Sequence, residues 1–221
     1  MKRDYLKHLL VLLVTLFTSL SANAYDAYID GIYYNLDAVT KQATVTSGDN
    51  KYEGELNIPS TVAYEGETYD VTSIKNSAFS YCTALTSVTI PESVTSIGSY
   101  AFSGCRGLTS VTIPSSVTNI GEWAFYNCES LTSVTIPESV TSIGNNAFNG
   151  CTGLSSISFA DGLTKIGSYA FSECSSLDNI SLPSSITHIG SGAFSKCTSL
   201  TSVIIPSGVV DIEMDVFYYC I

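Results

Sequence analysis

The chain has 221 residues, 45% of them apolar, and carries 9 basic against 20 acidic residues, for a formal net charge of −11. A surface this acidic repels nucleic acid phosphates and anionic lipid head groups. We therefore expect neither nucleic acids nor anionic membranes as partners. The apolar share is large enough to build a substantial core.

Residues 1–24 have the features of a cleaved signal peptide. A basic start with Lys2, Arg3 and Lys7 precedes an apolar run over 9–20 and an Ala22-Asn23-Ala24 cleavage site. The run is too short to cross a bilayer as a helix, and no cysteine marks a lipid anchor. We therefore expect a secreted or cell-surface protein without a membrane span. Its removal takes three basic and one acidic residue, leaving six and nineteen and a net charge of −13.

Residues 25–53 predict an N-terminal β cap. Apolar and polar residues alternate over 28–36 and 43–45, with turns at 37–42 and 47–50, which is typical of a β-hairpin. Such a cap would cover the first strand edge of whatever follows, because an open edge invites aggregation.

A repeat begins in the segment 54–221. Its register first appears at 56–62, is interrupted by a nine-residue insertion around 63–70, and then runs on with a period of 23. The marker residues are phenylalanines and cysteines, at Phe79, Phe102, Phe125, Phe148, Phe171, Phe194 and Phe217, and at Cys82, Cys105, Cys128, Cys151, Cys174, Cys197 and Cys220. An unbroken period of this length is the signature of a solenoid.

Each 23-residue unit predicts the same succession of local structures. The β-branched run at 108–113 favours a short strand, which Pro114 ends because proline has no amide hydrogen for the ladder. A second extended segment follows at 117–120, and we expect Gly121 to supply a corner with positive φ. The Ala-Phe-x-x-Cys run predicts a short helical or 3₁₀ turn.

One such unit cannot bury both of its apolar edges. Stacked units bury each other, and each strand then pairs in parallel with its neighbour about 4.8 Å away. The fold class expected is a leucine-rich repeat solenoid, an α/β-type right-handed superhelix of mostly short parallel β-strands with helical turns and a β-hairpin cap.

The pattern A-F-x-x-C-x-x-L-x-x-V-x-I-P-x-x-V-x-x-I-G, present at 101–121 and 124–144, resembles the BspA-like leucine-rich repeat family. The resemblance implies a curved solenoid with a parallel sheet on one face and export by host-associated microbes. For some relatives it also implies binding of host matrix proteins or other cells. The family has no shared catalytic residues, and this chain departs from ordinary leucine-rich repeats by having Pro-x-x-Val after the strand.

The seven cysteines fit a column of buried free thiols better than disulfides. Their number is odd and their spacing uniform, and the Cβ atoms of stacked equivalents stay farther apart than a disulfide tolerates. No C-x-x-C pair exists and His188 is the one histidine left after export, so we expect no metal site and no cofactor.

The candidate binding surface has two parts. Short hydroxyls occupy outward strand positions, at Ser87, Thr89, Ser110, Thr112, Ser133, Thr135, Ser156 and Ser158, and could receive a peptide or sugar, or simply suit an exposed strand. Aromatic residues stand just before the repeat alanine, at Tyr100, Trp123 and Tyr169. They are either anchors for a partner or a cover for the turn.

Catalysis has no support in the sequence. A nucleophilic pair would have to use His188, and no phosphate loop or dinucleotide motif is present, so we expect no enzyme. The favoured function is adhesion to, or recognition of, host matrix proteins, glycans or other cells. The alternative is a structural spacer within a longer repeat array, with end-to-end self-association and no ligand of its own.

Overall fold

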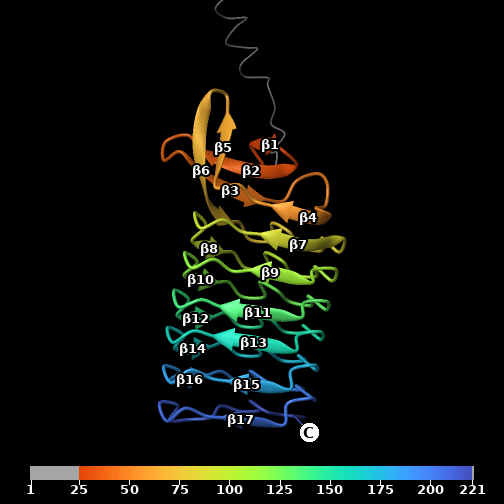
Figure 1. Ribbon diagram of the computed structural model, residues 1–221, viewed down its shortest axis with the longest axis vertical. Helices are drawn as coiled ribbons and strands as arrows, with labels where there is room; N and C mark the ends of the chain where they lie inside the picture. Colours follow the sequence, from red (N-terminus) through yellow and green to blue (C-terminus); the bar gives the residue numbers. More distant parts are fainter. Residues whose placement is uncertain (1–24, 221) are drawn as a thin grey trace, which may run out of the picture.

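The computed structural model describes residues 25–220, so the expected signal peptide at 1–24 lies outside the described residues. The described chain is a β-solenoid built as a vertical stack of turns (Figure 1). The expected short helical or 3₁₀ turns are wrong, because the described part of the chain contains strands and turns but no helix.

The stack begins with antiparallel strands. β1 (Ala27–Ile29), β2 (Ile32–Asp37) and β3 (Gln42–Thr46) form two successive hairpins. β3 then pairs in parallel with β6 (Glu67–Ile74), while β5 (Thr61–Tyr64) folds back antiparallel on β6. The hairpins therefore lead directly into the parallel sheet, and the insertion around 63–70 is the β5–β6 hairpin.

Two parallel sheets form two sides of the solenoid. The first sheet contains β4 (Gly54–Asn57), β7 (Leu85–Thr89), β9 (Ser110–Thr112), β11 (Ser133–Ile136) and β13 (Ser156–Phe159), and β15 (Asn179–Ser181) and β17 (Ser202–Ile204) pair below them. The second continues from β6 through short strands, β8 (Ser96–Ile97), β10 (Asn119–Ile120), β12 (Ser142–Ile143), β14 (Lys165–Ile166) and β16 (His188–Ile189).

The third side is a ladder of turns that carries the Ala-Phe-x-x-Cys run. Two residues four apart have positive φ in each repeat, as at Tyr100 (59°) and Gly104 (72°), and this prevents a continuous right-handed helix. The N–H groups of Tyr100, Phe102 and Gly104 instead donate to carbonyls of the next turn, at 2.9, 2.7 and 2.7 Å. The backbone polarity of these turns is thus satisfied between repeats.

The expected positive φ at Gly121 is also wrong. Positive φ falls two residues later, at Trp123 (59°), and glycine is needed at 121 for a different reason. A Cβ on Gly121 would lie 2.6 Å from the backbone nitrogen of Ser99 in the preceding turn. Glycine therefore permits close approach between successive turns.

The core consists of columns of identical side chains, as predicted. Consecutive phenylalanine rings from Phe79 to Phe217 stack with centroids 4.8 to 5.7 Å apart and interplanar angles of 4 to 10°. The repeat alanines and leucines are buried beside them, for example Ala124 and Leu131. At the N-terminal end Tyr52 packs on Phe79 and extends the aromatic column into the cap.

Candidate functional site

The hydroxyl side chains predicted as a binding surface lie together on the outer side of the first sheet. We call this surface the strand face and define it by the outward residues of β7, β9, β11, β13, β15 and β17. The alternation of each strand sends Val111 and Val134 into the core and leaves Ser110, Thr112 and Ser133 exposed. Of the eight predicted strand residues, seven are exposed and Ser87 is half-buried.

These residues are in register across the sheet. Ser87 lies beside Ser110, which lies beside Ser133, and Ser133 lies beside Ser156. The threonine positions follow the same order, and Ser158 donates a hydrogen bond to the hydroxyl of Thr135 at 3.2 Å. A hollow of about 310 Å³ opens between β9 and β11, and another of about 270 Å³ between β15 and β17. The strand face is therefore a flat surface of hydroxyl groups with shallow hollows.

The predicted aromatic residues lie elsewhere, on the ladder of turns. Tyr100 and Trp123 stack with centroids 5.8 Å apart and rings almost parallel, and Tyr126 packs edge-on against Trp123. The ring of Tyr169 covers Gly192, where an added Cβ would be 2.3 Å from the tyrosine ring. Tyr100, Trp123 and Tyr169 all have positive φ, but so does the same position in every repeat from Ser77 to Asp215. The backbone conformation is therefore a property of the repeat and not of a particular site.

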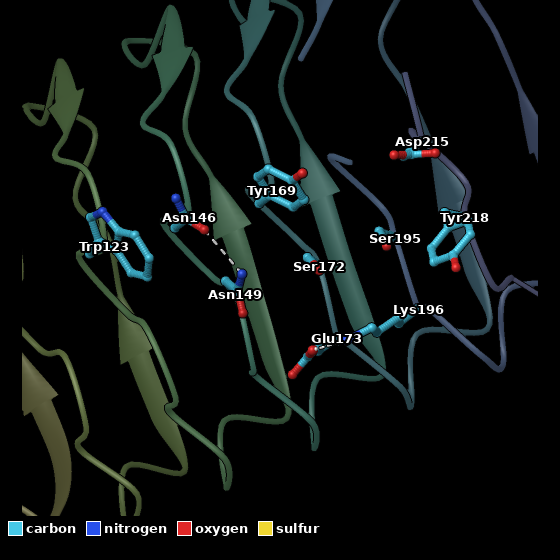
Figure 2. A pocket seen from close by; sticks show the side chains of 10 residues that line it. All are labelled: Trp123, Asn146, Asn149, Tyr169, Ser172, Glu173, Ser195, Lys196, Asp215 and Tyr218. Carbon is cyan, nitrogen blue, oxygen red and sulfur yellow. Dashed lines mark hydrogen bonds and ion pairs between the residues drawn. The ribbon is translucent and has the colours of Figure 1, made fainter. Parts of the chain in front are cut away.

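Trp123 and Tyr169 line a groove of about 570 Å³, which we call the turn groove (Figure 2). Its other lining residues come from successive turns, at Asn146, Asn149, Ser172, Glu173, Ser195, Lys196, Asp215 and Tyr218. Tyr100 does not line it, and none of its residues lines either hollow of the strand face. The structure thus separates the two parts of the predicted surface onto different sides of the solenoid.

The repeat itself creates the turn groove. The small residues Ser172 and Ser195 are buried and leave its floor low between the larger side chains. Trp123 stands at one end and Tyr218 at the other, with Tyr169 on one side and the Glu173–Lys196 ion pair, at 2.6 Å, on the opposite side (Figure 2). Within the groove, the side-chain amide of Asn149 donates a hydrogen bond to the side-chain carbonyl of Asn146 at 3.1 Å.

The chain matches the protein-family model described as "BspA type Leucine rich repeat region", in six copies over residues 61–152 and 124–221. The match covers well over half of the sequence. The chain belongs to the BspA-type leucine-rich repeat family.

Solved leucine-rich repeat proteins share this architecture. A leucine-rich repeat protein from Bacteroides ovatus is 36% identical, with a TM-score of 0.80 over 88% of this chain and 51% of its own. A leucine rich cell surface protein from Faecalibacterium prausnitzii is 32% identical, with a TM-score of 0.61 over 83% and 55%. The T. pallidum leucine rich repeat protein is 26% identical, with a TM-score of 0.67 over 80% and 91%.

The BspA-type chain described here spans about half the length of the Bacteroides and Faecalibacterium structures. No curated protein matches it. The comparisons thus establish the family and the fold.

The cysteine column of this BspA-type solenoid consists of free thiols, as predicted. Each thiol from Cys105 onward donates to the carbonyl of the phenylalanine 26 residues earlier, as for Cys128 to Phe102 at 3.2 Å. Burial, and to a smaller extent the neighbouring Cys82 thiol, raises the pKa of the Cys105 thiol to about 12. A thiol held protonated is a poor nucleophile, so the column serves packing.

The remaining candidates for chemistry are dispersed. The Nε2 atom of His188 lies 3.3 Å from a carboxylate oxygen of Glu213, and both side chains are partly exposed. Within residues 25–220, no group of three or more His, Cys, Asp or Glu side chains is placed to hold a metal ion. The same part of the chain contains no helix with the length and apolar character needed to cross a bilayer.

Sequence reasoning missed most of the turn groove. Trp123 and Tyr169 were predicted as candidates, but the polar lining residues Glu173, Lys196, Ser172 and Ser195 were not singled out. Yet Glu173 and Lys196 are opposite charges 23 residues apart, as are Arg106 and Glu129, which also form an ion pair. In a BspA-type stack this separation places two side chains on adjacent turns, so the signal was present in the spacing.

Proposed function

We propose that this BspA-type protein is a secreted or cell-surface binding module that holds an extracellular macromolecule non-covalently. The ligand classes are host matrix proteins, glycans and components of other cells. The observation that carries the proposal is the strand face: hydroxyl side chains in register on adjacent strands, exposed along the length of the sheet.

Three features support this reading of the strand face. Most of its side chains are exposed, and the hollow between β9 and β11 is lined by residues 110–113 and 133–135. Short hydroxyls both donate and accept hydrogen bonds and lose little conformational entropy when bound. The rigid stack also holds them at fixed spacing, which reduces the cost of ordering the surface on association.

Location at the cell surface is supported by relatives and by the N-terminal sequence. The Faecalibacterium structure is described as a leucine rich cell surface protein, and residues 1–24 have the composition of an export signal. After removal of that segment the net charge of −13 keeps the strand face away from anionic membranes and nucleic acids.

The test is binding of the purified protein to immobilised extracellular matrix proteins, to a glycan array and to host cells. A double variant, Thr112→Lys with Thr135→Lys, places two ammonium groups on adjacent strands of the strand face. We expect saturable binding by the native protein and a loss of about tenfold in affinity for the variant, because bulky charges block close contact.

The matched control is Thr118→Lys with Thr141→Lys. These threonines are also exposed and 23 residues apart, but they precede strands β10 and β12 of the second sheet. If both double variants lose binding equally, or neither does, the strand face is not the binding surface. If the native protein binds nothing saturably, the proposed function is wrong.

A second candidate function, assembly, is favoured by the C-terminal end of the described stack. β17 is the last strand of its sheet, and large apolar side chains are exposed around it, at Ile204, Val210, Ile212, Met214, Tyr218 and Tyr219. An edge strand with apolar neighbours is a template for pairing with another turn or chain.

Sedimentation velocity over a range of concentrations distinguishes assembly from binding. An assembling module self-associates as its concentration rises, and Ile204→Lys abolishes the association because the exposed strand edge becomes charged. Thr135→Lys, on β11 between β9 and β13 of the first sheet, is the control that leaves the association intact. A monomer at every concentration refutes self-assembly.

A further inference from the structure

The turn groove has the shape and chemistry of a carbohydrate-binding site, and we propose that it binds a neutral linear oligosaccharide. This proposal rests on the proposed function, because it names one class of ligand for an extracellular binding module. It assigns that ligand to the ladder of turns, away from the strand face. The observation behind it is a groove of about 570 Å³ lined by aromatic rings and by side-chain amides (Figure 2).

The aromatic residues are placed to receive the apolar faces of sugar rings. Trp123, Tyr169 and Tyr218 come from different turns, and in the buried column next to them successive ring centroids are 5.0 to 5.7 Å apart. Trp123 and Tyr169 are thus two turns apart, a separation that suits alternate sugar units of one extended chain. The C–H faces of a pyranose pack on aromatic rings as other apolar groups do.

The rings are fixed before any ligand arrives. Trp123 is packed between Tyr100 and Tyr126, and Tyr169 lies over Gly192. Their backbone N–H groups donate to carbonyls of the next turn, Asn145 and Ser191, each at 2.9 Å. Side chains that are already ordered lose little entropy when they bind.

The polar groups of the groove match hydroxyls. The Asn149-to-Asn146 hydrogen bond uses one donor and one acceptor of the pair, which leaves an amide donor and a carbonyl acceptor for a ligand. Sugar hydroxyls donate and accept, so both can be used. Ser172 and Ser195 add hydroxyl groups on the floor.

The charges of the groove favour a neutral ligand. Lys196 is paired with Glu173, which leaves Asp215 as the uncompensated charge among the lining residues. The protein as a whole is strongly acidic. Sulfated or sialylated chains would therefore be repelled.

An extended peptide is a poorer match for the turn groove. Peptides that bind by strand addition need free backbone N–H and C=O groups. In these turns the backbone groups already bond to the adjacent turn, as for Phe125 to Ala147 at 2.7 Å and Phe148 to Ala170 at 2.8 Å. Recognition must therefore come from side chains.

The experiment titrates the purified protein with neutral hexasaccharides (β-1,4-glucan, α-1,4-glucan, β-1,4-mannan, β-1,4-xylan and chitin) by calorimetry, with a heparin hexasaccharide as the anionic comparison. The repeat itself supplies variants that fold. Trp123→Asn and Tyr169→Asn introduce the residue that occupies the equivalent position at Asn146, and asparagine tolerates positive φ.

The matched control is Tyr81→Asn. Tyr81 also has positive φ and covers a glycine, Gly104, as Tyr169 covers Gly192, and the equivalent residue at 127 is an asparagine. Tyr81 lies outside the turn groove. Removal of the amide by Asn149→Ser introduces the residue found at Ser103, Ser172 and Ser195.

We expect at least one neutral hexasaccharide to bind, with affinity reduced about tenfold by Trp123→Asn and by Tyr169→Asn, reduced by Asn149→Ser, and unchanged by Tyr81→Asn. Equal binding by all variants overturns the assignment to the groove. So does a preference for heparin, or groove-dependent binding of peptides but of no hexasaccharide. Failure of every hexasaccharide, together with matrix-protein binding that depends on Thr112 and Thr135, overturns the groove and leaves the proposed function standing.

Discussion

At the scale of single residues, one phenylalanine in each turn does most to fix the stack. Phe125 is fully buried and stacks on Phe102 and Phe148 at 5.0 Å on either side. Its contribution combines apolar burial with ring contacts to two neighbours, whereas Phe217 has a neighbour on one side in the described stack.

Replacement of Phe125 by alanine should therefore lower the free energy of unfolding by about 3–5 kcal/mol. Phe217→Ala is the control, because this ring is only partly buried and a smaller loss is expected. Urea denaturation followed by circular dichroism measures both. Similar losses at the two positions would mean that the column does not act through neighbours on both sides.

The thiol column makes stability depend on pH. Burial raises the pKa of Cys105 and Cys197 to about 12, and raises that of Cys128 and Cys174 well above the ordinary value of 9.0. Because the folded pKa exceeds the unfolded one, the contribution of each thiol is fully present below pH 9 and is lost as pH rises from 9 toward 12.

The free energy of unfolding should accordingly change little between pH 7 and 8 and fall above pH 9, by up to about 1.4 kcal/mol per pH unit for each buried thiol. Cys128→Ala removes one titrating group and should make the decline shallower. Urea denaturation at a series of pH values measures this. A decline whose slope is the same in native protein and variant would contradict the role of the thiols.

At the scale of elements, the period of 23 sets the register of all three sides of a turn. The spacing of apolar residues and prolines predicts three features of each turn. These are the inward positions, the strand ends before Pro114 and Pro137, and the stacking direction. These predictions hold because a ladder repeats a side-chain pattern that the sequence shows directly.

The turn conformation was not predictable in the same way. The Ala-Phe-x-x-Cys run has helical spacing, but its hydrogen bonds go to the next repeat and require positive φ at residues such as Trp123, which the residue type disfavours. The role of Gly121 was missed for a related reason, since the clash that excludes a side chain is with Ser99 of another turn. Both features depend on contacts between repeats.

The turn groove was also only partly predictable from the sequence, because its residues come from several turns. Tyr100, Trp123 and Tyr169 were predicted together as aromatics just before the repeat alanine, but Tyr100 does not line the groove. Their separation from the strand face, and the contribution of Ser172 and Ser195, depend on the path of the backbone between turns. The outward positions of β7, β9, β11 and β13 were predictable because strand alternation alone defines them, although Ser87 is half-buried.

The β5–β6 hairpin and the repeats should differ in how well they tolerate inserted residues. Two glycines inserted between Glu65 and Gly66, at the tip of the β5–β6 hairpin, should cost less than about 1 kcal/mol, because lengthening an exposed loop costs little entropy. The same insertion after Gly150 displaces the donors that bond to the next turn and should unfold several turns. Thermal unfolding compares the two, and equal tolerance would contradict a register shared by adjacent turns.

At the scale of the whole molecule, the protein is a stack in which each turn contacts its neighbours, with a β cap at one end (Figure 1). Such proteins have stability that is nearly a sum of turns and of the interfaces between them. The same periodicity gives two long surfaces on different sides, the strand face and the ladder of turns with its groove. A rigid stack can therefore present both of the surfaces that we propose for binding without conformational change.

The most direct test of this account is amide hydrogen exchange across the Phe-x-x-Cys turns. The account predicts that the N–H groups of Phe102, Phe125 and Phe148 exchange as slowly as those of the neighbouring strands, because each donates to the next turn at 2.7 to 2.8 Å. Fast exchange at these three amides, at the rate of solvent-exposed loops, would contradict the stacked solenoid on which both proposed surfaces depend.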